Sequence, residues 1–136
     1  MVAYDFFGQI DVFDFNLNKA FSIKINHGQK QANWNKVEDY EVPFGAWSYF
    51  NDLQTTDSYI FALYNNYQVT EDLTIDIKYS NTSIILQFNW NGELINKFII
   101  PELIDKFLVD SEFSKIIAIR RINTESPFII YNLSSK

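Results

Sequence analysis

The sequence contains no cysteine, and it has only four glycines and three prolines among 136 residues. Without cysteine the chain cannot form disulfides, thiolate metal sites, Fe–S clusters or thiol nucleophiles. Hydrophobic residues, at 47%, are abundant enough for a core to stabilise the fold instead. The scarcity of glycine and proline argues against a long flexible linker, so we predict a single domain over residues 1–136.

Long apolar runs and a recognisable leader are also missing. No stretch approaches the roughly 20 apolar residues that a membrane span requires. The first residues, Met1 to Asp5, have neither the basic nor the apolar region of a signal peptide. The sequence therefore predicts a cytoplasmic protein that does not enter a membrane.

The acidic residues are concentrated in the N-terminal half of the chain, where basic residues are few. Residues 1–76 contain 11 acidic residues and 4 lysines, a net charge of −7, whereas residues 77–136 contain 6 acidic and 7 basic residues. Contact with phosphates needs a basic face, so direct binding of nucleic acid is disfavoured. The acidic N-terminal half is either a solubilising surface or an electrostatic face for a basic partner.

Motifs for catalysis and cofactor binding are absent. The one histidine, His27, has no nucleophile motif beside it, and no glycine-rich phosphate loop is present. We predict a protein that is not an enzyme and that binds no cofactor and no metal. Three weak alternatives stay open: a metal-dependent nuclease strand at Asp76-Ile77-Lys78, a glycosidase-like carboxylate pair, and a calcium site at Glu38, Asp39 and Glu41.

Alternating polar and apolar residues predict strands in much of the chain. Asn91-Gly92 is a strong signal for a two-residue hairpin turn. That turn sets Phe88 opposite Ile95 and Ile84 opposite Ile99 in the predicted pairing. The expected strands are residues 2–7, 10–15, 20–25, 73–79, 83–90, 93–100, 115–122 and 128–133, of which 73–100 form a three-stranded antiparallel meander.

Two segments show spacing that favours helix. Pro101 and Glu102 are typical of a helix start, and Leu103, Ile104, Phe107 and Leu108 follow at helical spacing. Residues 44–68 fit helix or strand, and we expect helix for part of them, with Thr56 or Asp57 as the cap. The predicted fold class is α+β, a strand-dominated antiparallel sheet or sheets with one or two helices packed on it.

An aromatic and acidic segment is the candidate partner-binding site. Trp34 lies in a polar stretch where a large ring is hard to bury, and Tyr40 lies among three acids. Aromatic anchors dominate binding energy, and acidic groups steer association with a basic partner. The predicted contact residues are Trp34, Glu38, Asp39, Tyr40 and Glu41. As an alternative, Trp34, Trp47 and Trp90 cover the core or stack on a sugar or nucleotide.

These features predict a small, acidic, non-catalytic protein that binds and inhibits another protein, in the manner of an immunity protein, an antitoxin or a phage-encoded inhibitor. The expected partner is a protein, such as a basic nuclease toxin. The alternative is a domain that binds or sequesters a small ligand in an aromatic-lined pocket. A homodimer formed by pairing of sheet edges is compatible with either function. No motif ties the chain to a known family.

Overall fold

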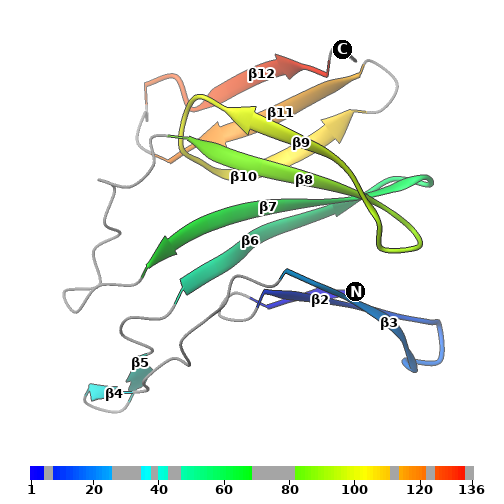
Figure 1. Cartoon of the computed structure of the whole chain (residues 1–136). Coiled ribbons are helices and arrows are strands. Elements are labelled where there is room, and N and C mark those ends of the chain that lie inside the picture. The colour runs from blue at the N-terminus through cyan, green and yellow to red at the C-terminus, as the bar shows by residue number, and fades with distance from the viewer. Residues whose placement is uncertain are drawn as a thin grey trace. The chain divides into compact units, whose positions relative to one another are not determined.

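A computed structural model describes residues 1–4, 8–25, 35–37, 40–42, 47–68, 82–110, 114–121 and 125–133, with the backbone alone for 35–37, 40–42, 47 and 65–68. All regular elements in these ranges are strands (Figure 1). The strands are β1 Val2–Ala3, β2 Gln9–Phe13, β3 Lys19–Lys24, β4 Asn35–Val37, β5 Tyr40–Val42, β6 Trp47–Thr55, β7 Tyr59–Gln68, β8 Ser83–Asn89, β9 Leu94–Ile100, β10 Ile104–Asp110, β11 Lys115–Arg120 and β12 Phe128–Asn132.

The strands form three sheets, β1-β2-β3, β6-β7-β8-β9 and β10-β11-β12, and a two-stranded ribbon, β4-β5. All pairs whose register is defined are antiparallel. The predicted antiparallel sheets are therefore confirmed, but the predicted α+β class is wrong, because the described ranges contain no helix packed on a sheet. They also contain no helix with the length and apolarity needed to cross a membrane.

The contacts divide the chain into two compact units, and each is described by itself. Unit 1 is Met1–Phe50 with Asn65–Ser80, and unit 2 is Asn51–Tyr64 with Asn81–Lys136. In unit 1, one face of β1-β2-β3 buries Ile10, Val12 and Ile23. Gly8 precedes β2 where a side chain would not fit, because a Cβ there would lie 2.6 Å from the Ile25 carbonyl oxygen.

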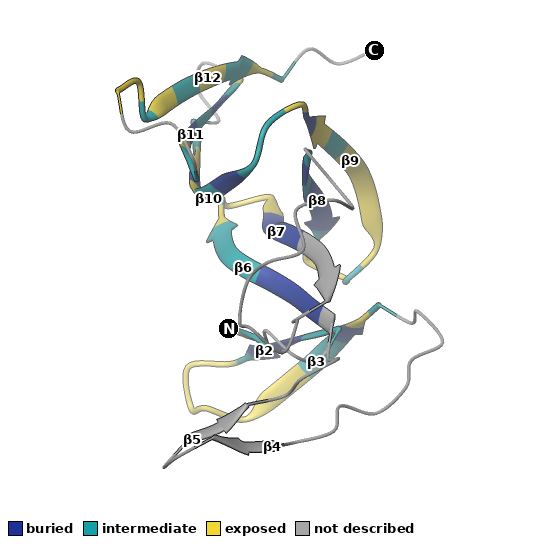
Figure 2. Ribbon diagram, turned by 90° about the vertical axis from the view of Figure 1, so that its left-hand side faces the viewer, coloured by how far each residue is buried: buried dark blue, intermediate teal, exposed yellow. Residues whose placement is uncertain are grey.

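The core of unit 2 is shared by two sheets. Its buried members come from β7 and β8, the end of β9, and β10 and β11: Phe61, Leu63, Ile85, Ile100, Ile104, Phe107, Ile116 and Ala118. Strands β7 and β8 are buried on both faces, whereas β9 is an exposed edge strand (Figure 2). Burial on both faces explains why residues 59–64 form an uninterrupted apolar run rather than an alternating one.

The helix expected after Pro101 is strand β10, and a β-bulge explains the error. Ile104 pairs with Arg120 and Lys106 pairs with Ile119, so Asp105 is an extra residue in β10. The extra residue brings Ile104 and Phe107, three positions apart, to the same buried face. A spacing of three is a helical signal in the sequence, and the bulge produces it in a strand.

The helix favoured within residues 44–68 is also wrong, since this segment forms β6 and β7. The capping signal at Thr56 has a different use: its hydroxyl accepts a hydrogen bond from the Tyr59 N–H, 3.1 Å away, in the turn between the strands. A helix N-cap makes the same bond to the residue three positions later. The hydrogen bond of Thr56 is therefore the same in a helix cap and in this turn. The pairing of β7 with β8 is what makes the segment a strand.

The hairpin between β8 and β9 is confirmed, but its turn is one residue longer than predicted. Asn89 pairs with Glu93 around a three-residue loop, which sets Phe88 opposite Leu94 rather than Ile95. A bulge at Ile95 then restores the predicted register, and Ile84 lies opposite Ile99 as expected. The predicted strand 73–79 lies outside the described residues.

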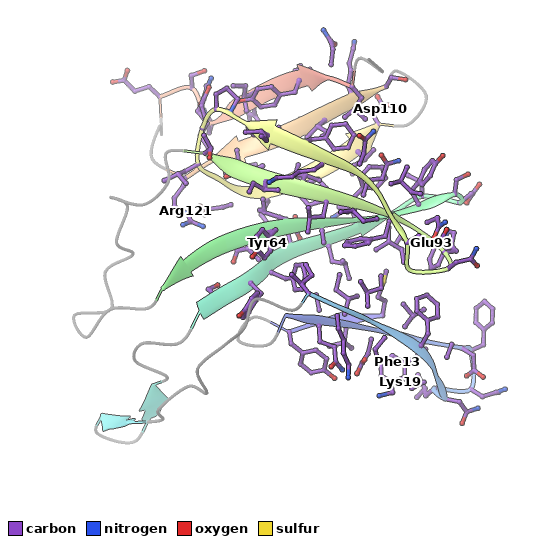
Figure 3. All side chains as sticks on the ribbon, viewed as in Figure 1. Phe13, Lys19, Tyr64, Glu93, Asp110 and Arg121 are labelled. Atoms are coloured by element: carbon purple, nitrogen blue, oxygen red, sulfur yellow. The ribbon has the colours of Figure 1, made fainter. Side chains whose placement is uncertain are left out.

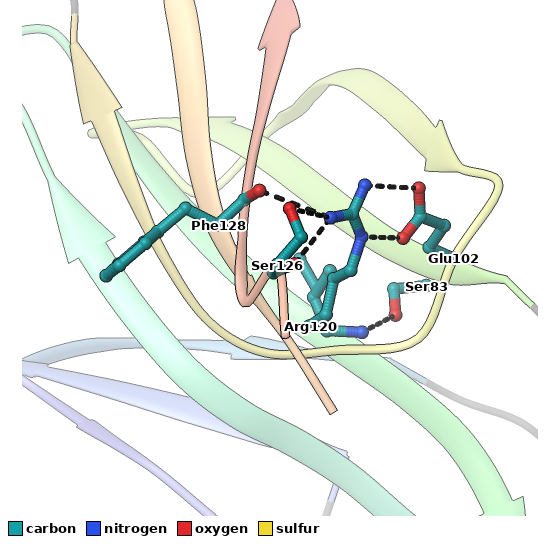
Figure 4. A network of polar contacts seen from close by, with 6 residues as sticks. Ser83, Glu102, Arg120, Ser126 and Phe128 are labelled. Atoms are coloured by element: carbon teal, nitrogen blue, oxygen red, sulfur yellow. Dashed lines mark hydrogen bonds and ion pairs between the residues drawn. The ribbon is translucent and has the colours of Figure 1, made fainter. Parts of the chain in front are cut away.

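A polar network fastens the corner between β9 and β10 to the end of β11 (Figure 4). The Arg120 guanidinium pairs with both carboxylate oxygens of Glu102 and donates to the carbonyl oxygens of Ser126 and Phe128. This arginine lowers the pKa of the Glu102 carboxyl. The Ser83 hydroxyl accepts from the Ile104 N–H at 2.9 Å. These residues therefore stabilise the fold, because their hydrogen bonds are made to other groups of the same chain.

Candidate functional site

The residues predicted to contact a partner are only partly described. Trp34, Glu38 and Asp39 lie outside the described residues, whereas Tyr40 and Glu41 belong to β5. In the ribbon, Tyr40 pairs with Val37 and Glu41 pairs with Lys36. Contact through these residues stays a prediction. The alternative chemical sites at His27 and at Asp76-Ile77-Lys78 also lie outside the described residues.

The loop that joins β2 to β3, Asp14–Asn18, is the candidate site that the structure adds; we call it the Phe15 loop. Its backbone closes with two hydrogen bonds: the Asp14 N–H donates to the Asn18 carbonyl at 2.9 Å, and the Leu17 N–H donates to the Asp14 carbonyl at 3.1 Å. Leu17 has a positive φ of 63°. A turn followed by a left-handed residue is a common three-residue hairpin loop.

The Asp14 carboxylate organises this loop from inside. One of its oxygens accepts the N–H groups of Asn16 and Asn18, at 2.8 and 2.9 Å, and the other accepts from the Asn18 side-chain amide at 3.2 Å. The hydrogen bonds from Asn18 and Asn16 lower the pKa of the Asp14 carboxyl. The acid is therefore ionised at neutral pH, and its three hydrogen bonds stabilise this loop conformation.

The loop presents two apolar side chains to solvent. Phe15 is completely exposed, and Leu17 is 81% exposed. Phe13 and Lys19, which flank the loop, mark the end of the hairpin (Figure 3). Isolated exposed apolar residues are common, but here two of them stand on a loop fixed by five hydrogen bonds. A rigid apolar projection of this kind is suited to enter a pocket on another molecule.

The chain contains a second loop of the same construction, Asn89–Glu93 between β8 and β9, which we call the Trp90 loop. Its backbone makes the two corresponding hydrogen bonds, each of 3.0 Å. The Asn89 side-chain oxygen accepts the N–H groups of Asn91 and Glu93, as the Asp14 carboxylate does for Asn16 and Asn18. The two loops therefore provide an internal comparison of what the turn itself requires.

The two loops differ at the aromatic position and at the left-handed position. Trp90 is 40% exposed, and its indole N–H donates to the Asp57 carbonyl at 2.9 Å, so the ring is held by the adjacent turn. The ring of Phe15, in contrast, is completely exposed. The left-handed position is Gly92, with φ 84°, in the Trp90 loop and Leu17 in the Phe15 loop. Glycine adopts this conformation without cost, whereas a leucine is strained by roughly 1 kcal/mol.

The sequence holds a signal for this site that composition and periodicity do not detect. Asp14-Phe15-Asn16-Leu17-Asn18 matches Asn89-Trp90-Asn91-Gly92-Glu93 in type at its first three positions: an Asp or Asn, an aromatic residue and an asparagine. The residue types of Asn16 to Lys19 are typical of a turn, and the loop in the structure begins two residues earlier, at Asp14. Comparing the two loops identifies Leu17 as the residue that departs from turn chemistry.

The buried Asp11 in unit 1 is a second cluster of polar groups. Its carboxylate accepts hydrogen bonds from the Tyr4 hydroxyl, the Gln9 amide and the Ser22 hydroxyl, and Lys19 lies 4.0 Å away. The bond from Ser22 contributes most to lowering the pKa of Asp11. With its acceptor capacity used within the sheet, Asp11 is a structural residue. Among the described residues, no three His, Asp or Glu side chains gather to hold a metal ion.

No protein-family model matches the chain, and none of the curated proteins or solved structures matches it. The features of the chain that bear on function are the geometry of the Phe15 loop and the charge distribution of the sequence.

Proposed function

We propose that this chain is a non-catalytic protein-binding domain that inhibits its partner by inserting the Phe15 loop into a cavity of that partner. The observation that carries the proposal is the strained, fully exposed pair Phe15 and Leu17 on a loop that Asp14 holds rigid. A turn formed for connection alone would use glycine, as the Trp90 loop does. Strain of this kind is typical of functional positions.

The charge of the chain supports a basic partner. Residues 1–76 carry a net charge of −7, and both the Phe15 loop and the predicted contact segment 34–41 belong to unit 1. Acidic groups increase the rate of association with a basic surface, while aromatic anchors supply most of the affinity. A cytoplasmic basic enzyme, such as a nuclease toxin, is the partner that we propose.

The test compares capture by the wild-type chain and by the double variant Phe15→Ala/Leu17→Ala. Each chain is immobilised, exposed to lysate of the native host, washed at moderate salt and analysed by mass spectrometry. We expect one protein to be retained in stoichiometric amount by the wild type and to be reduced at least about tenfold with the variant, since truncating an anchor costs roughly 2 kcal/mol or more.

Two further measurements decide between binding and inhibition. Leu94→Ala, which removes an exposed leucine beside the Trp90 loop, is the matched control and should retain the partner fully. The purified partner is then assayed for its own activity with increasing amounts of the wild-type chain. Equal capture by the wild type and by the double variant would remove the Phe15 loop from the binding site. Capture without loss of the partner's activity would reject inhibition.

A further inference from the structure

The Trp90 loop contains a reactive pair of residues that the proposed function does not use. Asn91 is followed by Gly92, and this is the one place in the sequence where a glycine follows an asparagine. The backbone nitrogen of the residue after an asparagine is positioned to attack the side-chain amide carbon and close a five-membered ring. Glycine favours this attack, because it has no Cβ to obstruct the approach and adopts backbone angles that other residues avoid.

The structure places this pair at an accessible loop tip. Asn91 is exposed, and its backbone N–H donates to the Asn89 side-chain oxygen at 3.0 Å. Gly92 has a φ of 84°, and its own N–H donates to the Asn89 carbonyl oxygen at 3.0 Å. The last of these bonds must open before the Gly92 nitrogen reacts. Local opening at an exposed loop costs little free energy compared with unfolding of the whole chain.

We infer that Asn91 is a site of spontaneous deamidation, in which the Gly92 nitrogen is the nucleophile and water is the second reactant. The nitrogen gives up its proton and forms a bond to Asn91 Cγ. The bond between Cγ and Nδ2 breaks, and Nδ2 leaves as ammonia with that proton. Water then adds to one of the two carbonyl carbons of the cyclic imide, and the ring opens to aspartate or to isoaspartate. Nothing is oxidised or reduced in either step.

The Phe15 loop shows what suppresses the same reaction. Asn16 occupies the position equivalent to that of Asn91, it is exposed, and its N–H donates to the Asp14 carboxylate at 2.8 Å. The next residue, however, is Leu17 and not a glycine. A side chain on that residue obstructs the attack and restricts the backbone angles that ring closure needs. The two loops share their hydrogen bonds and differ in the nucleophile, so the Phe15 loop should stay intact.

The two products of the reaction change the Trp90 loop in different ways. Aspartate keeps the backbone and adds a negative charge near Glu93, which is exposed at the end of the loop (Figure 3). Isoaspartate adds a carbon atom to the backbone between residues 91 and 92. The Asn89 side-chain oxygen accepts the N–H groups of both Asn91 and Glu93, and the extra atom lies between these two groups. Isoaspartate should therefore loosen the end of the β8-β9 hairpin.

Peptide mapping of the purified full-length chain, after prolonged incubation in mildly alkaline buffer, tests the inference. Digestion with a protease active at acidic pH avoids further reaction, and chromatography with mass spectrometry separates the amide, aspartate and isoaspartate forms. We expect Asn91 to convert at least about tenfold faster than Asn16, with both products present. Gly92→Ala should slow conversion of Asn91 by at least about tenfold, because its Cβ obstructs the nitrogen.

Leu17→Gly is the converse variant, since it places an asparagine-glycine pair in the Phe15 loop. Asn16 should then convert at a rate within about tenfold of that of Asn91, whereas the control Leu17→Ala should leave Asn16 intact. A synthetic peptide of residues 87–96 gives the rate of the unfolded sequence. Conversion of the peptide while Asn91 of the chain stays intact would overturn the inference, as would equal conversion of Asn16 and Asn91 in the wild type. Neither measurement involves the partner, so the result is independent of the proposed function.

Discussion

Leu17 occupies a backbone conformation in which a leucine side chain raises the free energy of the folded state. Its φ of 63° is left-handed, and the equivalent position of the Trp90 loop is Gly92. Because Leu17 is 81% exposed, the loop gains little burial from the side chain in return. The strain thus belongs to a residue whose side chain the fold does not need.

Replacing Leu17 by glycine should therefore stabilise the fold and weaken binding. We expect Leu17→Gly to raise the free energy of unfolding by about 0.5–1 kcal/mol, as the relief of strain exceeds the extra flexibility of glycine in the unfolded chain. Urea unfolding followed by circular dichroism measures the change. Partner capture should fall in the same variant, since an apolar contact is lost.

The Trp90 loop supplies the matched control for this prediction. Gly92→Ala places a side chain at the same left-handed position and should lower the free energy of unfolding by about 1 kcal/mol, without affecting partner capture. If Leu17→Gly proved less stable than the wild type, Leu17 would contribute packing in the folded chain, and its strain would no longer indicate a binding role.

At the scale of elements, β10 is stabilised along its free edge by side chains of β6. The Asp52 carboxylate accepts the Phe107 N–H at 3.0 Å and pairs with Lys106 at 3.4 Å. The Asn51 side-chain amide donates to the carbonyl oxygen of Asp105, the bulge residue, at 3.3 Å. These bonds satisfy groups on the edge of β10 that faces away from β11 among the described strands.

Asp52→Ala should consequently destabilise the fold by about 1–3 kcal/mol, because it leaves the Phe107 N–H without an acceptor at a largely buried position. Asp57→Ala, which changes an exposed acid in the turn after β6, should alter stability by less than about 0.5 kcal/mol. Thermal and urea unfolding compare the two variants. Equal stability of both would show that water replaces the carboxylate at this edge.

The elements also show where sequence reasoning succeeded. Alternation of apolar and polar residues located β3, β8, β9, β11 and β12, since each follows a simple two-residue period or adjoins a clear turn. It failed at β10, where the bulge at Asp105 changes the spacing of Ile104 and Phe107, and at β7, where burial on both faces removes alternation. Both errors come from tertiary pairing that no local window of sequence contains.

The candidate site was predictable only in part, for a related reason. A turn near Asn16 is evident from its residues, but the sequence does not distinguish the fully exposed ring of Phe15 from that of Trp90, which bonds to the Asp57 carbonyl of a neighbouring turn. Similarly, the exposure of Leu108, Phe128 and Ile130 follows only from the strand register, which places them on the side of the sheet opposite to Phe107 and Ile116.

At the scale of the whole molecule, charge is divided between a strongly acidic half and a nearly neutral half. Residues 1–76 carry a net charge of −7 and residues 77–136 a net charge of +1. A chain with this asymmetry approaches a basic partner with its acidic part foremost, and the effect weakens as salt screens it. The acids Glu38, Asp39 and Glu41 are the densest group in that half.

Reversing these three acids to lysine should slow association with the captured partner by about tenfold at low salt and abolish most of its salt dependence. The melting temperature should change little, because charges on a surface contribute weakly to stability. The control reverses Asp57, Glu93 and Glu125, which are exposed acids elsewhere in the chain. Each triple variant gains six charges, from −6 to zero, so net charge is the same in both.

Stopped-flow association rates of the two variants separate local steering from net charge. A slower rate for the first variant alone places the partner beside residues 38–41 and supports the acidic, aromatic segment as part of the interface. Equal slowing in both would mean that the field of the whole molecule acts, without a preferred segment. An unchanged rate in the first variant would exclude Glu38, Asp39 and Glu41 from the approach path and leave the Phe15 loop to bind without electrostatic steering.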